Sequence, residues 1–120
     1  MLGTFVLSEG YYDAYYSKAQ TVRKLVHDKT LEIFNNYDFI ITPTTPCTAF
    51  EIGENIKDPI KMYLQDIYTV QANIVGIPAI SIPFKKDKQG LPYGIQLMAA
   101  KFNDFVLLKF SQRIYNILND

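Results

Sequence analysis

The stretch DPIKMYLQDIYTVQANIVGIPAISIP, residues 58–83, decides the predicted fold because it contains the signals for a helix, a sharp stop and a buried strand. Asp58 is a suitable N-cap, and Pro59 suits the first helical position, where no backbone donor is needed. The next apolar side chains recur at three- and four-residue steps and form one stripe: Ile60, Leu64, Ile67, Val70 and Ile74, with Tyr63 beside them. Gly76 can adopt the left-handed conformation that ends a helix, and the proline-bounded segment AISI, residues 79–82, predicts a buried strand.

Asp66, near the middle of this stretch, has two possible roles. At about 100° per residue it falls on the flank of the apolar stripe, on the same side as Met62 and Asn73. Since most helical aspartates are solvated, the spacing alone favours an aspartate that faces water. The alternative is a carboxylate that binds a substrate, and Asp66 is the one acidic residue for which we consider that role.

The composition limits the classes of function. A chain of 120 residues with 48% hydrophobic residues can form one domain with a core. The 12 basic and 12 acidic residues cancel, and no basic patch stands out, so we expect no direct binding of nucleic acid. The single cysteine, Cys47, allows no internal disulfide and suits a reducing compartment. No apolar run has the length of a membrane span and no signal pattern opens the chain, so we expect a cytoplasmic location.

A long helix is predicted before this stretch. Residues 1–8, MLGTFVLS, are typical of the middle of a helix whose beginning is not included, and residues 11–34 predict a second helix after a break at Gly10. The expected buried face of the second helix comprises Tyr12, Tyr15, Ala19, Val22, Val26, Ile33 and Phe34. Its tyrosines form either part of the core or a binding surface, and the helical spacing favours the core.

The apolar run FII, residues 39–41, predicts a strand covered on both faces, and TPTTP, residues 42–46, follows it. Ligands gather outside the carboxyl ends of strands in open α/β sheets, so this hydroxyl-rich loop either lines a site or is an ordinary loop. Cys47 lies in the same loop. A catalytic cysteine needs a base, and no pattern links Cys47 to His27, the only histidine, so a Cys/His dyad is not favoured.

The last part of the chain predicts a strand and a helix. Residues 95–98, IQLM, follow a short polar turn, which indicates a strand antiparallel to the AISI strand. Asn103 or Asp104 can cap a final helix. The apolar stripe of that helix comprises Leu107, Phe110, Ile114, Ile117 and Leu118. The order helix, strand, helix, strand, strand, helix predicts an α/β fold with a mixed β-sheet covered by α-helices.

No known catalytic motif occurs in the sequence. The glycine-rich phosphate and dinucleotide loops, the G-x-S-x-G turn and metal-ligand spacings of cysteine and histidine are all absent. None of the four serines lies in a glycine-rich turn that would expose an activated hydroxyl. The residues therefore indicate a chain that can bind a substrate but has no catalytic residues of its own.

Four stretches together resemble the amidase-signature family, and within it the glutaminase subunits of the glutamyl-tRNA(Gln) amidotransferases. They are MLGTFVLSEGYYDAYYSKAQTVR, YDFIITPTTPCTAF, DPIKMYLQDIYTVQANIVGIPAISIP and GLPYGIQLM. The resemblance covers nearly the whole chain. It implies that residues 1–120 are the C-terminal piece of one amidase-signature domain.

The resemblance also implies an activity for the longer glutaminase subunit, which is the A subunit of such an enzyme. It hydrolyses glutamine to glutamate and ammonia with a Ser–cisSer–Lys triad. The partner B subunit uses ATP and Mg to convert Glu-tRNA(Gln) to Gln-tRNA(Gln) with that ammonia, and a small C subunit clasps the other two. The triad would lie upstream of Met1, so the chain itself is expected to have no catalytic residue, cofactor or metal site and to be inactive alone.

Two positions connect this sequence to the site of that family. Asp66 matches the substrate-binding aspartate, which would pair with the α-ammonium of glutamine, and a carboxylate suits such a cation. Gln71 departs from the family, which usually has proline at this point of a T-x-P-x-N run. The departure implies that the helix continues one turn longer here.

Two other interpretations remain open. One is a piece of another amidase-signature hydrolase that acts on small amides, and Asp66 weighs against it because a simple amide needs no partner for an ammonium. The other is a non-catalytic α/β interaction module, and the uncapped apolar start at Met1 weighs against that. Since part of the parent sheet and its helices would be missing, we expect the isolated chain to self-associate.

Overall fold

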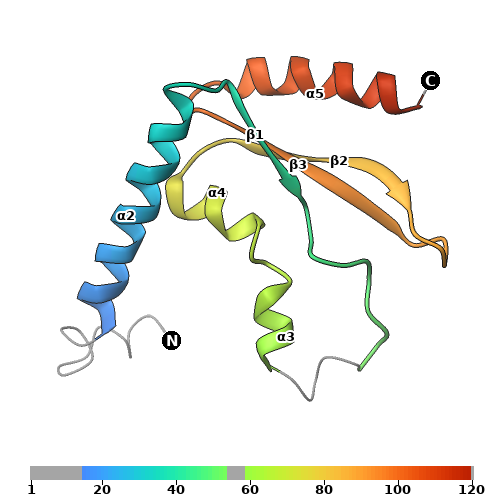
Figure 1. The fold of residues 1–120 in the computed structure, drawn as a ribbon, viewed down its shortest axis with the longest axis horizontal. Helices are drawn as coiled ribbons and strands as arrows, with labels where there is room; N and C mark the ends of the chain where they lie inside the picture. Colours follow the sequence, from blue (N-terminus) through green and yellow to red (C-terminus); the bar gives the residue numbers. More distant parts are fainter. Residues whose placement is uncertain (1–14, 54–58, 120) are drawn as a thin grey trace.

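A computed structural model describes residues 15–53 and 59–119 of the chain (Figure 1). The elements in order are α2 (Ser17–Phe34), β1 (Phe39–Pro43), α3 (Pro59–Leu64), α4 (Thr69–Val75), β2 (Ala79–Lys86), β3 (Pro92–Ala99) and α5 (Asp104–Asn119). This order follows the prediction, except that the central helix is divided in two. The helix predicted for residues 1–8, the break at Gly10 and the proposed N-cap Asp58 lie outside the described residues.

The three strands form one sheet in the order β1-β3-β2. Phe39 pairs with Ala99 at one end of the β1–β3 ladder, and Ala79 pairs with Met98 in the β2–β3 ladder. The predicted α/β class is confirmed, and so is the antiparallel run of β3 against β2. Both pairs among the described strands are antiparallel, so any parallel pair of a mixed sheet lies outside this part of the chain.

Helix α5 covers one face of the sheet, as Figure 1 shows. Leu97 and Ala99 of β3 and Ile82 of β2 pack against Leu107, and all four side chains are buried. The ring of Phe39 stacks on Phe110 with centroids 4.3 Å apart. The half-buried side chains around this cluster are Phe39, Ile80, Ile95, Phe110, Ile114 and Leu118. The predicted stripe of α5 is therefore confirmed except at Ile117, which is 75% exposed because it points away from the sheet.

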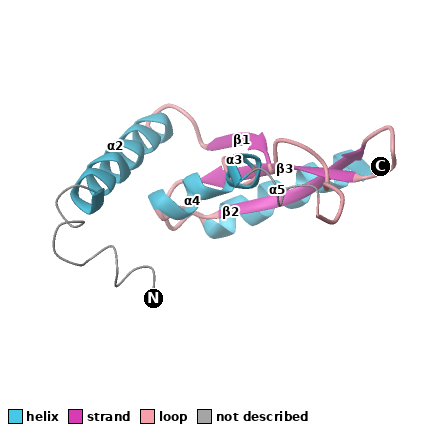
Figure 2. Cartoon of the chain, turned by 90° about the horizontal axis from the view of Figure 1, so that it is seen from below, coloured by secondary structure: helices cyan, strands magenta, loops and turns pink. Residues whose placement is uncertain are grey.

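The opposite face carries a smaller cluster. Met98 of β3 packs with Ala72 and Val75 of α4 and with Ile77, and Ile40 adjoins them from β1. Helix α2 packs beside α4 and contributes Val26 and Phe34. In Figure 2, α2 extends beyond the end of the sheet at which α4 lies. The second layer is thus made of two helices, of which α4 is the nearer to the strands.

Only part of the predicted apolar face of α2 is buried. Val26 and Phe34 are half-buried, whereas Val22 is 52% exposed and Tyr15, just before α2, is 64% exposed. The expectation that Tyr15 belongs to the core is wrong, since this residue, which precedes α2, is largely exposed. Tyr12, which belongs to the same predicted face, lies outside the described residues.

The predicted single helix over residues 59–75 is wrong. Helix α3 ends at Leu64, α4 begins at Thr69, and residues 65–68 form a turn between them. The amides of Gln65, Asp66 and Ile67 each bond to the carbonyl three residues earlier, at 3.2–3.4 Å, which tightens the chain out of the α-helix. The break precedes Gln71, and α4 continues through Gln71 to Val75, so a helix does extend beyond this position.

The end of α4 agrees with the prediction. Gly76 has φ 73° and ψ 44°, the left-handed conformation, and its amide donates to the Ala72 carbonyl at 2.9 Å. The chain then enters β2 at Ala79, within the predicted AISI strand. Glycine at this position lets α4 stop close to the edge of the sheet.

Candidate substrate-binding site

The loop after β1 is fastened to the sheet by two hydrogen bonds from Thr44. Its amide donates to the Gly94 carbonyl of β3 at 3.0 Å, and its Oγ1 lies 2.7 Å from Ser81 Oγ of β2. The pair of hydroxyls therefore spans β3 over Gly94. A Cβ at Gly94 would lie 2.9 Å from Ser81 Oγ and 2.9 Å from the Ile82 carbonyl oxygen, so only glycine leaves room for this bridge.

The rest of the loop reaches two other parts of the chain. Thr48 Oγ1 donates to Asp87 Oδ2 at 2.8 Å, in the turn between β2 and β3. Cys47 Sγ contacts the side-chain amide of Gln65, with 3.3 Å to Nε2 and 3.4 Å to Oε1. Gln65 begins the turn between α3 and α4. The sequence alone did not decide whether the hydroxyl-rich loop is an ordinary loop or lines a site. In the structure this loop lies against the turn that contains Asp66.

Asp87 organises the β2–β3 turn with one carboxylate. Its Oδ1 accepts the Gln89 amide at 2.8 Å and the Leu91 amide at 2.9 Å, while its Oδ2 accepts the Thr48 hydroxyl. These hydrogen bonds hold the pKa of Asp87 below its usual 3.8 because they stabilise the ionised carboxylate. The bond from the Thr48 hydroxyl has the largest effect, and those from the backbone amides add to it. The charged carboxylate therefore links the loop after β1 to the hairpin.

Asp66 lies in the turn between α3 and α4, and its side chain is exposed. Its carbonyl accepts the amides of Thr69 at 3.1 Å and Val70 at 3.0 Å. None of the ion pairs among residues 15–53 and 59–119 involves Asp66. The carboxylate is therefore accessible to a cationic ligand at the surface, and its exposure also agrees with the solvated role that the spacing favoured.

Gln96 connects this turn to the sheet. Its side chain is 4% exposed, and its Nε2 donates to the Tyr68 carbonyl at 3.0 Å and to Thr42 Oγ1 at 3.2 Å. Tyr68 is the last residue of the turn, and Thr42 lies in β1. The turn, the start of the hydroxyl-rich loop and the central strand are thereby held together by one buried amide.

The structure does not bring Cys47 and His27 together. His27 lies on α2, where its Nδ1 is 3.1 Å from Asp28 Oδ1, and Cys47 contacts Gln65 instead. Within residues 15–53 and 59–119, no group of three histidine, cysteine, aspartate or glutamate side chains could hold a metal ion. None of the described helices is long and apolar enough to cross a membrane.

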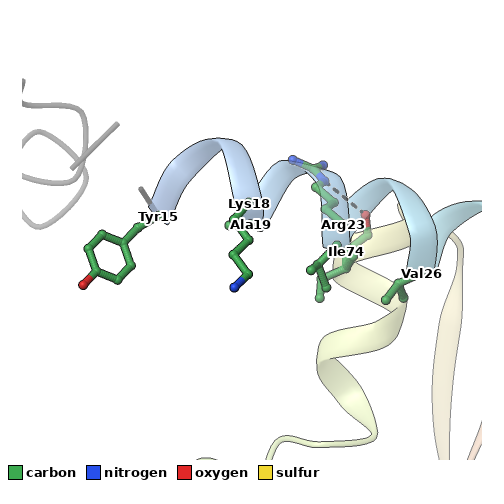
Figure 3. Close-up of a pocket in the computed structure, with 7 residues that line it drawn as sticks. Tyr15, Lys18, Ala19, Arg23, Val26 and Ile74 are labelled. Atoms are coloured by element: carbon green, nitrogen blue, oxygen red, sulfur yellow. Dashed lines mark hydrogen bonds between the residues drawn. The ribbon is translucent and has the colours of Figure 1, made fainter. Parts of the chain in front are cut away.

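A separate apolar hollow of about 310 Å³ lies on α2, away from the turn (Figure 3). Val22 and Val26 line it from α2, Tyr15 lines it from just before α2, and Ile74 lines it from α4. The Nε of Arg23 donates to the Ile74 carbonyl at 3.4 Å, which is the dashed line in Figure 3. Since a carbonyl near the end of α4 is bonded here, the contact fastens α4 to α2 and leaves the hollow itself apolar.

The sequence matches a known protein family over most of its length. The family profile described as Amidase matches residues 1–108. The chain belongs to the amidase family.

Several members of the amidase family are closely similar to this chain. The A subunit of the glutamyl-tRNA(Gln) amidotransferase of Brevibacillus brevis is 54% identical over 109 residues, which cover 91% of this chain and 22% of that protein. The subunit of the same name from Halothermothrix orenii is 49% identical over 119 residues, 99% of this chain and 25% of that protein. The crystal structure of the corresponding Thermotoga maritima subunit superposes with a TM-score of 0.82 at 47% identity, over 95% of this chain and 25% of that one.

The chain spans about a quarter of the length of these amidase-family relatives. The predicted resemblance to the A subunits of glutamyl-tRNA(Gln) amidotransferases is confirmed, because the sequence identity of 47–54% extends over nearly all of this chain. Sequence reasoning singled out Asp66 but missed Gln96 and Ser81. A signal existed for Gln96, because a polar residue within an apolar strand such as IQLM needs a hydrogen-bond partner when it is buried. For Ser81, which is exposed, no such signal exists.

Proposed function

We propose that the chain is the C-terminal part of the glutaminase subunit, or A subunit, of a glutamyl-tRNA(Gln) amidotransferase. The observation that supports this proposal is the 54% identity to such a subunit along 91% of the chain. The longer subunit would hydrolyse glutamine with a Ser–cisSer–Lys triad that lies outside this chain. The B and C subunits of the amidotransferase would be its partners in the cytoplasm, with ATP and Mg used by the B subunit to amidate Glu-tRNA(Gln).

Within that function, Asp66 would bind the α-ammonium of glutamine. An exposed carboxylate in a turn held against the sheet, and outside the ion pairs of the described residues, supports this role. A carboxylate and an ammonium form a charge-assisted hydrogen bond, about twice as strong as a neutral one. The chain would then contribute a substrate ligand to the glutaminase site and no catalytic group.

The kinetics of Asp66→Asn test the proposal. In the longer subunit with its partners present, the bound ammonium and Asp66 would be enclosed by the rest of the site. We therefore expect glutamine-dependent ammonia release to lose about 2–5 kcal/mol of apparent affinity or rate, as for a buried charge left unpaired. Hydrolysis of a simple amide without an amino group should change little. Asp38→Asn is the matched control, because Asp38 is also exposed but lies before β1. Unchanged kinetics for Asp66→Asn would remove Asp66 from the site.

The second candidate is another amide hydrolase of the same family. The solved structure of 6-aminohexanoate cyclic dimer hydrolase is 25% identical and superposes with a TM-score of 0.70. The two candidates differ in what Asp66 recognises. A loss on Asp66→Asn that is as large for simple amides as for glutamine would favour the hydrolase, since such amides carry no ammonium.

We also propose that the isolated chain associates with further copies of itself. Its radius of gyration is 17.5 Å, whereas a compact domain of this length has roughly 14 Å. Val22, which is 52% exposed, leaves part of the apolar face of α2 open, and a face of this kind promotes association. Light scattering at working concentration should show a mass above the monomer, and Val22→Glu should lower it. A monomer at all concentrations would contradict the proposal.

A further inference from the structure

Gln96 is a polar residue in the centre of the sheet. It lies in β3 between Ile95 and Leu97, and 4% of its surface is exposed. An amide buried at this position costs free energy unless its hydrogen bonds are made, and an apolar side chain would avoid that cost. Both N–H groups of a glutamine can donate, and its Nε2 indeed has two acceptors. The arrangement indicates that the amide has a task beyond filling space.

The two acceptors of Gln96 belong to different elements. Thr42 Oγ1, at 3.2 Å, is at the end of β1 from which the hydroxyl-rich loop leaves. The Tyr68 carbonyl, at 3.0 Å, belongs to the turn between α3 and α4. The side chain therefore fixes the distance between the sheet and the turn at a single buried point.

Tyr68 and Asp66 are parts of one tight unit. The Asp66 carbonyl accepts the Thr69 and Val70 amides, and it also accepts the Thr69 hydroxyl at 3.2 Å. The three bonds fold the backbone of residues 66–70 onto itself. A shift of the Tyr68 carbonyl must therefore move Asp66 with it.

The other tertiary hydrogen bonds near the turn act elsewhere. Gln71 Nε2 donates to Thr30 Oγ1 at 3.0 Å, and Arg23 donates to the Ile74 carbonyl, so both fasten α4 to α2. Cys47 contacts the side chain of Gln65 but not the backbone of the turn. Among the described residues, the bond from Gln96 is the one that joins the backbone of the turn to the sheet.

We infer that Gln96 is a positioning residue, which holds the Asp66 turn against the sheet through the Tyr68 carbonyl and so sets where the Asp66 carboxylate meets the ammonium of the substrate. This inference rests on the proposed function of Asp66. A carboxylate displaced by about 1 Å can cost roughly 100-fold in a positioned reaction. Gln96 itself touches no substrate.

The test is a double-mutant cycle in the longer subunit with its partners present. Gln96→Met keeps the length of the side chain and removes both donors. We expect it to raise the KM for glutamine by about tenfold and to change kcat by less than about twofold, because binding in the ground state and the transition state weakens equally. In the Asp66→Asn background the same change should raise KM by less than about twofold, since residues that act through one another are not additive.

A control separates positioning from stability. Ser111→Ala removes another buried side-chain hydrogen bond, from Ser111 Oγ to the Leu107 carbonyl at 2.7 Å, within α5 on the opposite face of the sheet. It should leave the KM for glutamine unchanged. Leu107→Ala, which truncates a 2% exposed side chain on the same face, should lower the unfolding midpoint without changing that KM. Hydrogen exchange gives a second measure: Gln96→Met should speed the exchange of the Thr69 and Val70 amides in the turn, and Ser111→Ala should not.

The outcomes of the double-mutant cycle distinguish the role of Gln96 from the role of Asp66. If Asp66→Asn raises KM and Gln96→Met does not, or if the two effects add in full, the inference is overturned and the proposed function stands. If Asp66→Asn leaves both KM and kcat unchanged, the proposed function of Asp66 fails and the role given to Gln96 fails with it. If each single variant raises KM and the two effects do not add in the double variant, the result supports both the role of Asp66 and the role of Gln96.

Discussion

The two faces of the sheet are held to their helices by different forces. On the α5 face, Leu97, Ala99 and Leu107 form a dry cluster, and Phe39 stacks on Phe110. On the α4 face the apolar cluster is smaller, and side-chain hydrogen bonds carry the contacts between elements. Apolar contact is strong but non-directional, whereas a buried hydrogen bond fixes a distance.

The difference indicates that the two faces of the sheet have different roles. The α5 face has the larger apolar cluster and therefore contributes more to the stability than the α4 face. The α4 face places a surface turn, and Gln96, Gln71 and Arg23 each fix one point of the layer that contains it. Changes on the first face should act on unfolding, and changes on the second face should act on the position of Asp66.

The largest expected effect comes from the α5 face. Leu97→Ala removes a side chain with no exposed surface and should lower the free energy of unfolding by about 2–5 kcal/mol. Urea denaturation of the chain measures this. Leu108→Ala is the matched control, because Leu108 on α5 is 56% exposed and its truncation should cost less than about 0.5 kcal/mol. Equal losses for the two variants would contradict the assignment of the core to this face.

A smaller effect is expected from the hydrogen bonds between α2 and α4. Thr30→Val keeps the shape of a residue that is 2% exposed but removes the acceptor of Gln71 Nε2, and should cost about 1–2 kcal/mol. The Oγ1 of Thr30 also donates to the Val26 carbonyl at 2.8 Å, so part of this cost lies within α2.

The double variant Thr30→Val with Gln71→Met isolates the bond between the helices. If the bond holds α4 in place, the two single losses should not add, and the coupling should be about 1 kcal/mol. Additive losses would show that each side chain acts on its own helix alone.

The smallest effect concerns Asp87 and depends on pH. The folded state lowers the pKa of Asp87 below 3.8, so its contribution to stability is complete above pH 3.8 and is lost as the pH falls through the folded-state pKa. We therefore expect the urea midpoints of the natural chain and of Asp87→Asn to differ near neutral pH and to converge in acid.

The signals that predicted the fold correctly were local. The left-handed stop at Gly76, the antiparallel strands of the hairpin and most of the α5 stripe depend on a few neighbouring residues, and each was confirmed. The break between α3 and α4 was not predicted because the apolar stripe continues through it. In the structure Ile60 is 70% and Ile67 54% exposed, so the stripe had no partner to pack against along that part of the chain.

The candidate site was predicted less completely than the fold. Asp66 was identified through the family resemblance, and its turn could not be inferred from spacing. Gln96 reaches partners on β1 and beside α4, which are distant in sequence, and no local pattern specifies such a pairing. Residues whose role depends on a distant acceptor need the tertiary structure.

The strand order β1-β3-β2 has a consequence for the order of folding. Strand β1 pairs only with β3 among the described strands, and β3 is made after β2, close to the end of the chain. During synthesis the hairpin of β2 and β3 can close over a short turn, and α5 can then cover it. The pairing of β1 with β3 forms only after β3, far along the chain, has been made. A ribosome-bound intermediate would then expose the apolar run Phe39–Ile41, the segment at which a chaperone would be expected to bind first.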